Sequence, residues 1–248
     1  MPQGVLCYRE PPLGYSHVCW VWGDPHIESF YGQSFDHHGL GVHTMAAWGA
    51  GEAEAVQIYS CPVKCGPGST ADWFPCGAAS AVAMAATVGG AHVMVMGDTL
   101  FVDGAEVTLA ENEMVSQAGV QVRRLRDNDP DYKTPGIHKL QITLDGANIS
   151  TWTYPVARMP TGYLNNVRLE LQPSAWASYA SNTGMCKLSG AAAAASAAST
   201  QAAASPAWVA EKLAALEAAC NIMDNDDYQA DLSFGCAGPC SASPRPAP

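Results

Sequence analysis

The chain between residues 93 and 109 carries the clearest hydrophobic pattern. Hydrophobic side chains alternate with other residues there, at Val93, Val95, Leu100, Val102, Val107 and Leu109. Gly97-Asp98 and Asp103-Gly104 interrupt the alternation with residues that favour tight hairpin turns. Alternation of this kind is typical of strands with one buried face. The pattern therefore predicts a meander of antiparallel strands.

The same alternation recurs over residues 120–125, 139–144 and 167–171, with polar side chains on the opposite face. Two short apolar runs, residues 40–48 and 55–59, indicate core strands separated by a glycine-rich break. Many short strands without intervening helices favour two packed sheets. We predict a mainly β fold, an antiparallel two-sheet β-sandwich.

The C-terminal part has a different pattern. Residues 190–206 are almost all Ala and Ser, which predicts a linker or a marginal helix. Ser205-Pro206 then supplies a helix cap and a proline at the first helical position. Apolar residues follow at helical spacing, at Val209, Leu213, Leu216 and Cys220. We predict a helix over residues 206–219, within a short α-helical cysteine-rich appendage.

These patterns divide the chain into five predicted segments. They are an irregular arm (1–18), the main β domain (19–190), an Ala/Ser-rich linker (191–205), a helical cysteine-rich tail (206–241) and a proline-rich disordered end (242–248). A chain of 248 residues with 48% hydrophobic content can bury one main core and a small appendage.

The net charge of the chain and the length of its apolar runs limit which partners it can bind and in which compartment it is found. A net charge of -11 repels phosphate backbones and anionic lipids, so we expect no nucleic acid partner. No apolar run reaches transmembrane length, and residues 1–20 lack a secretory apolar segment. A charged fraction of only 14% favours an extracellular or cell-surface setting. We therefore expect a mature segment or fragment of a larger secreted protein, with a cytosolic protein as the alternative.

Nine cysteines are dispersed along the chain, which favours disulfides over zinc. The segment 61–76 allows Cys61 or Cys65 to pair with Cys76, and Cys220 to pair with a later cysteine, Cys236 or Cys240. Cys61-x-x-x-Cys65 and Cys236-x-x-x-Cys240 are the alternative metal half-sites. The odd number leaves one cysteine, Cys7 among the candidates, unpaired or joined to another chain.

Residues 19–36 form a long signature. Cys19 opens an aromatic-flanked strand, Gly23-Asp24-Pro25-His26 forms a turn, and Phe-x-Gly-x-x-Phe-Asp at 30–36 predicts a second strand. This stretch resembles the opening of a von Willebrand factor type D domain, and residues 184–190 resemble its closing cysteine loop. The resemblance implies a disulfide between Cys19 and Cys186. It also implies a calcium site, but Tyr31 and Lys187-Leu188 replace its oxygen-bearing positions, so we expect no cofactor.

The tail from Leu216 to Cys236 is similar to part of the cysteine-rich module that follows type D domains. Asp231 stands where that module has a cysteine, so the resemblance implies a degenerate copy. Asn148-Ile149-Ser150 is a glycosylation sequon after a predicted turn at Asp145-Gly146, which agrees with secretion.

Asp24-Pro25 is an acid-labile type of peptide bond. The Asp carboxyl can attack its own carbonyl carbon, and the proline nitrogen leaves well once it is protonated. The resemblance extends self-cleavage, known in some type D domains, to Asp24 and Pro25. His26 is placed to supply the proton, because histidine titrates at about pH 6.5. In the alternative interpretation, Asp24 caps a turn, Pro25 fixes its backbone and His26 packs on the next strand.

His37, His38 and His43 suggest a metal-dependent enzyme as a further alternative. Neighbours on a strand face opposite sides, so only one of His37 and His38 joins a site with His43. We therefore interpret the three as polar residues on a sheet edge, with no metal. The leading hypothesis is a non-enzymatic structural or adhesion module whose partners are other extracellular proteins or copies of itself. Self-processing is the alternative.

Overall fold

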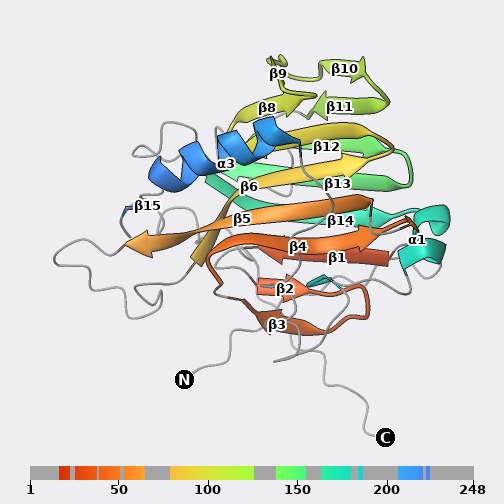
Figure 1. Cartoon of the computed structure of the whole chain (residues 1–248), viewed down its shortest axis with the longest axis horizontal. Coiled ribbons are helices and arrows are strands. Elements are labelled where there is room, and N and C mark those ends of the chain that lie inside the picture. Colours follow the sequence, from red (N-terminus) through yellow and green to blue (C-terminus); the bar gives the residue numbers. More distant parts are fainter. Residues whose placement is uncertain are drawn as a thin grey trace, which may run out of the picture.

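The structure is a computed structural model that describes residues 17–22, 26–37, 39–50, 53–64, 79–125, 138–154, 163–179, 184–186, 206–219 and 222–223. Two sheets lie one behind the other, with a helix in front of them (Figure 1). The predicted mainly β, two-sheet architecture is confirmed.

The first sheet has eight strands, all paired antiparallel. In spatial order they are β10 (Met114–Gln117), β11 (Val120–Arg124), β12 (His138–Leu144), β13 (Ala147–Tyr154), β14 (Tyr163–Leu171), β1 (His17–Trp22), β2 (His26–Glu28) and β3 (Ser34–Asp36). The strand nearest the start of the chain, β1, thus lies between β14 and β2 rather than at an edge.

The second sheet is a meander with additions at one side. Its main strands are β5 (Glu54–Lys64), β6 (Ala79–Val88), β7 (Ala91–Met96), β8 (Thr99–Val102) and β9 (Ala105–Val107). The strand β4 (Gly41–Trp48) pairs antiparallel with β5, and the short β15 (Ile222–Met223) pairs parallel with it. The predicted turns at Gly97-Asp98 and Asp103-Gly104 join β7 to β8 and β8 to β9.

One hydrophobic core lies between the two sheets. Buried residues from both contribute to it, among them Val21, Ile27, Val56, Ile58, Val93, Ile149 and Leu169. Their alternation along the strands is the pattern from which the sandwich was predicted. The core therefore holds β1 and β2, and with them the signature stretch, against the second sheet.

The strand β6 was not predicted, because half of its ten residues are alanine. Alanine favours helices, and a run of small residues shows no alternation. In the structure β6 is buried on both faces: Met84 belongs to the core between the sheets, and Val82 belongs to a second cluster on the other side. Two-sided burial overrides the intrinsic preference of the chain here.

Two further local predictions are corrected. The strand predicted over residues 30–36 is instead a turn after β2 followed by β3, which pairs back with β2. A short helix, α1 (Pro173–Tyr179), was also missed, because it buries only Ala175 and Tyr179, one helical turn apart, and this is too short a pattern to predict a helix. It packs through aromatic rings: Trp176 stacks on His17, and Phe30 meets Tyr179 edge to face with ring centroids 4.9 Å apart.

The predicted C-terminal helix is confirmed as α3 (Ala207–Ala219), which begins directly after Pro206. Val209 and Leu216 are buried in the second cluster, against side chains of the second sheet such as Met94 and Phe101. Across the described ranges, no helix combines the length and the apolar character that crossing a bilayer requires. The remainder of the predicted cysteine-rich tail, and the linker before it, lie outside the described residues.

Candidate functional site

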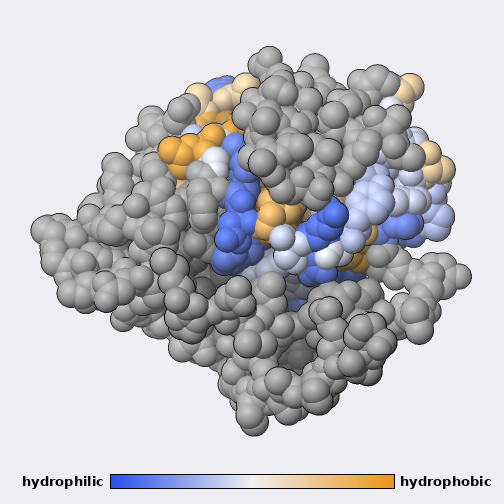
Figure 2. Space-filling model, turned by 90° about the horizontal axis from the view of Figure 1, so that it is seen from below, coloured by the Kyte–Doolittle hydropathy of each residue, from blue (hydrophilic) through white to orange (hydrophobic). Residues whose placement is uncertain are grey.

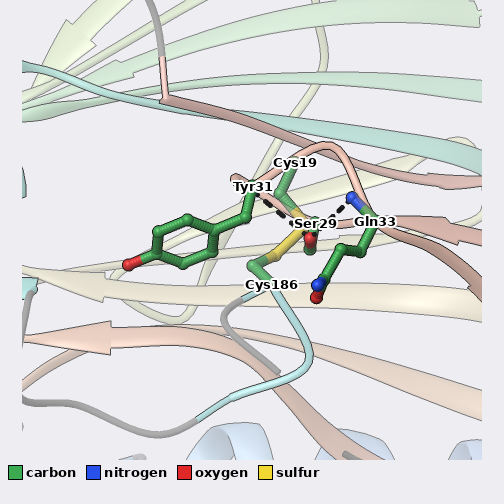
Figure 3. The surroundings of a disulfide bond; sticks show 5 residues. All are labelled: Cys19, Ser29, Tyr31, Gln33 and Cys186. Atoms are coloured by element: carbon green, nitrogen blue, oxygen red, sulfur yellow. Dashed lines mark hydrogen bonds between the residues drawn. A yellow bond between two sulfur atoms is a disulfide. The ribbon is translucent and has the colours of Figure 1, made fainter. Parts of the chain in front are cut away.

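The two ends of the signature meet at a disulfide. Cys19 on β1 and Cys186 are joined, with Cα atoms 5.6 Å apart and both residues fully buried (Figure 3). The segment of Cys186 also lies along β4, because the amides of Met185 and Cys186 donate to the carbonyls of Thr44 and Met45. The bridge thereby ties the first sheet to the edge strand of the second.

A turn over residues 29–33 packs beside this bridge. The Ser29 hydroxyl accepts hydrogen bonds from the amides of Tyr31 and Gln33 (Figure 3). The Phe30 amide donates to the Cys186 carbonyl. Tyr31, which stands at the expected calcium position, is 54% exposed. The other expected half of that site, Lys187-Leu188, lies outside the described residues.

The turn sets the register of β2 and β3 so that His26 lies directly opposite Asp36. His26 Nδ1 and Asp36 Oδ1 are 2.7 Å apart. A carboxylate can only accept a hydrogen bond, so Nδ1 carries the proton. The Asp36 carboxylate therefore holds the imidazole of His26. In the sequence, His26 directly follows Asp24 and Pro25, which lie outside the described residues.

Two other groups lie near this pair. The Trp22 ring on β1 is tilted towards His26, with ring centroids 5.8 Å apart. Glu28, two residues further along β2, lies opposite Trp20, and burial raises the pKa of its carboxyl. Figure 2 views the molecule from the side of β3 and shows hydrophilic residues beside hydrophobic ones on the described part of this face.

His37, which precedes β4, and His43, which lies on it, are not surface residues, which corrects the interpretation of these two as polar groups on a sheet edge. His37 and His43 are only 5% and 3% exposed. Their rings meet edge to face, with His37 Nε2 and His43 Nδ1 3.2 Å apart. Burial lowers the pKa of His43, although the Gly39 and Leu40 carbonyls partly oppose the shift. His38 lies outside the described residues. Within the described residues, no three metal-binding side chains form a group that could hold a metal ion.

The remaining predicted site residues are scattered. Asn148 is half-buried near the start of β13, opposite Thr143 on β12. Cys61 is fully buried and disulfide-bonded. The other predicted cysteines, Cys7, Cys65, Cys76, Cys220, Cys236 and Cys240, lie outside the described residues.

Sequence reasoning missed a cavity of about 240 Å³ between the two sheets. Leu100 and Val107 come to it from the second sheet, and Arg124, His138 and Leu140 from the first. These residues are far apart in sequence and share no motif, so nothing in the sequence points to this cavity.

No family model matches the chain, and no curated protein matches it either. The likeness to type D domains consequently rests on the motifs at residues 19–36 and 184–190.

Proposed function

We propose that the chain is a non-enzymatic extracellular module of the type D kind, which serves in a matrix, wall, filament or cell-surface assembly. One observation carries the proposal: a fully buried disulfide joins Cys19 and Cys186 at the two ends of the resemblance. Cys61 is disulfide-bonded as well. Disulfides persist in oxidising compartments, so this covalent framework favours an extracellular setting.

The partners follow from the same chemistry. The chain has nine cysteines, an odd number, so pairing within the chain leaves at least one available for a bond to another chain. We propose other extracellular proteins, or further copies of this chain, as the partners of the module, with Asn148 as a site of glycosylation. A net charge of -11 argues against nucleic acid.

The test is disulfide mapping of protein secreted from a eukaryotic host. Digestion without reduction should release a Cys19–Cys186 peptide pair, and denatured protein should show at most one free thiol. Several free thiols, with Cys19 or Cys186 among them, would instead support a cytosolic protein with reduced cysteines. Glycosidase treatment of the same sample checks Asn148, with Asn148→Gln as its control.

A second candidate function is self-cleavage at Asp24-Pro25. The 2.7 Å contact of His26 with Asp36 favours it, because it orients the imidazole of the residue that directly follows the acid-labile Asp24-Pro25 bond in the sequence. The fragments would stay together, since β1 pairs with both β14 and β2 and Cys19 is bonded to Cys186.

This candidate is tested by incubating purified protein at pH 5 and at pH 7.5. Cleavage should appear only on the reducing gel, more quickly at pH 5, and Asp24→Asn should abolish it. A chain that stays intact on that gel at both pH values would leave residues 23–26 as a structural turn.

A further inference from the structure

The outer face of the first sheet carries two rows of side chains near its β3 edge. On β1 and β2 the buried residues face the core, so the residues that alternate with them face outward. The register of the three strands aligns the outward side chains across the sheet. The rows are Trp22, His26 and Asp36 in one and Trp20, Glu28 and Ser34 in the other. All six residues are half-buried or exposed, and we call them the tryptophan face.

The two indole rings of the tryptophan face lie two residues apart on one strand, which separates their Cα atoms by about 7 Å. The Trp20 ring stacks on Trp152 with centroids 5.6 Å apart, and the Arg168 guanidinium lies 5.7 Å from its centroid. The Trp22 ring is tilted towards His26, with centroids 5.8 Å apart. Both rings are therefore oriented by their neighbours, and their spacing suits successive units of a chain-like ligand.

Hydrogen-bonding groups flank both rings. The Asp36 carboxylate, which accepts the hydrogen bond from His26 Nδ1, is 61% exposed and can accept further bonds from a ligand. Glu28 lies directly opposite Trp20, with Ser34 beyond it on the edge strand. A serine hydroxyl both donates and accepts. Flat apolar rings beside such groups match a ligand with apolar ring faces and a rim of hydroxyl groups.

The composition of the tryptophan face argues against two other classes of partner. The centres of protein interfaces are poor in aspartate, glutamate and serine, whereas this face carries all three and no aliphatic side chain. Polyanions are repelled by the net charge of -11 and by the carboxylates of Glu28 and Asp36. Arg168, beside Trp20, is paired with Glu170 at 2.9 Å. These observations favour a neutral ligand that is not a protein.

We propose that the tryptophan face binds a neutral polysaccharide. The C–H groups on the face of a pyranose ring carry a slight positive charge, so they pack on the negative face of an indole ring. The hydroxyl groups of the sugar then bond to the side chains of Asp36, Glu28 and Ser34. The inference rests on the proposed extracellular function, because neutral polysaccharides are components of walls and matrices.

The experiment measures binding of the full disulfide-bonded chain to oligosaccharides of cellulose, chitin, xylan, mannan and β-1,3-glucan by isothermal titration calorimetry. At least one of them should bind, and heparin should not. Trp22→Ala should weaken binding at least about tenfold, since a tryptophan at the centre of a contact surface contributes strongly to affinity. Asp36→Ala, at an exposed position, should weaken it about three- to tenfold through lost hydrogen bonds.

Trp208→Ala is the matched control, because Trp208 lies on α3 against Gly104, a residue of the second sheet's β8–β9 turn. Its affinity should stay within about twofold of wild type, as expected of a site remote from the tryptophan face. Melting temperatures identify any variant that fails to fold, and Asp36→Ala keeps the test decisive if Trp22→Ala is among them.

Binding to none of the neutral oligosaccharides, or binding that Trp22→Ala and Asp36→Ala leave unchanged, would overturn the inference. A dimer in sedimentation that Trp22→Ala dissolves, without any oligosaccharide binding, would also overturn it and assign the face to contact between two copies. These outcomes are distinct from failure of the proposed function, which disulfide mapping tests. Reduced Cys19 and Cys186 in a chain that still binds would overturn the extracellular setting alone.

Discussion

At the scale of single residues, the two histidine rings beside Gly39 leave no room for any side chain at this position. A Cβ added to Gly39 would lie 2.5 Å from His37 Nε2 and 2.7 Å from His43 Cε1. Both rings are buried, so neither can swing out to solvent without opening the link between β3 and β4. Glycine is required here for space.

We therefore expect Gly39→Ala to lower the free energy of unfolding by about 1–3 kcal/mol, the usual cost of overpacking a core. Urea denaturation measures this loss. The matched comparison repeats Gly39→Ala in a His37→Ala/His43→Ala background, where removal of both rings makes room for the methyl group. If the cost of Gly39→Ala is the same in both backgrounds, the steric argument is wrong.

The buried pair also predicts how stability depends on pH. Burial lowers the folded-state pKa of His43 below its ordinary value of 6.5. As the pH falls, the unfolded chain therefore binds a proton at His43 at a higher pH than the folded protein does. This contribution to stability is complete above pH 6.5 and is lost as the pH falls towards the folded-state pKa.

Urea midpoints at pH 7.5 and pH 5 check this expectation. The wild-type protein should be less stable at pH 5, and His43→Phe should reduce the difference between the two midpoints. An unchanged difference in the variant would mean that His43 does not contribute to the acid sensitivity.

At the scale of elements, the predictions succeeded where one face of a strand is polar. The segment 139–144 alternates, and in β12 Leu140, Ile142 and Leu144 are indeed buried while Gln141 and Thr143 are exposed. The alanine-rich β6 gave no such signal, because both of its faces are covered and its small side chains allow close packing. Tertiary burial, which the local sequence does not encode, decides its conformation.

The helix α3 covers the outer face of the second sheet, and this contact is testable. Leu216 is 5% exposed and belongs to the same cluster as Met94 and Phe101. Leu216→Ala should lower the free energy of unfolding by about 2–3 kcal/mol, because it removes buried methyl groups and leaves a cavity. Chemical denaturation followed by tryptophan fluorescence measures the change.

Ala215, one residue earlier and exposed, serves as the control. Ala215→Gln should cost no more than about 0.5 kcal/mol, since glutamine is also a good helix former. Equal effects of the two substitutions would show that the helix does not depend on its contact with the sheet.

At the scale of the whole molecule, the Cys19–Cys186 bond spans a sequence separation of 167 residues. In the chain-entropy account, closing so long a loop stabilises the fold by about 5 kcal/mol. The double variant Cys19→Ala/Cys186→Ala should lose stability of that order, as measured by guanidinium denaturation at pH 7.5. Loss of less than about 1 kcal/mol would show that packing alone holds the two ends together.

The candidate site was predictable to different depths. The Cys19–Cys186 pairing followed from the resemblance to type D domains, because the resemblance includes one of these cysteines at each of its two ends. The contact of His26 with Asp36 was not predicted, since it depends on the register that the Ser29 turn imposes on β2 and β3. The approach of His37 to His43 was missed for a similar reason: their burial arises where the chain passes from one sheet to the other.

The position of the buried bridge has a mechanical consequence. Tension applied between the segment before Cys19 and the segment after Cys186 passes through two sulfur atoms, across Cα atoms 5.6 Å apart. The 167-residue separation corresponds to about 550–600 Å of extended chain, and none of that length is released under load. In a filament or wall the domain would act as a short inextensible link, and it would keep this property even if the Asp24-Pro25 bond were cut.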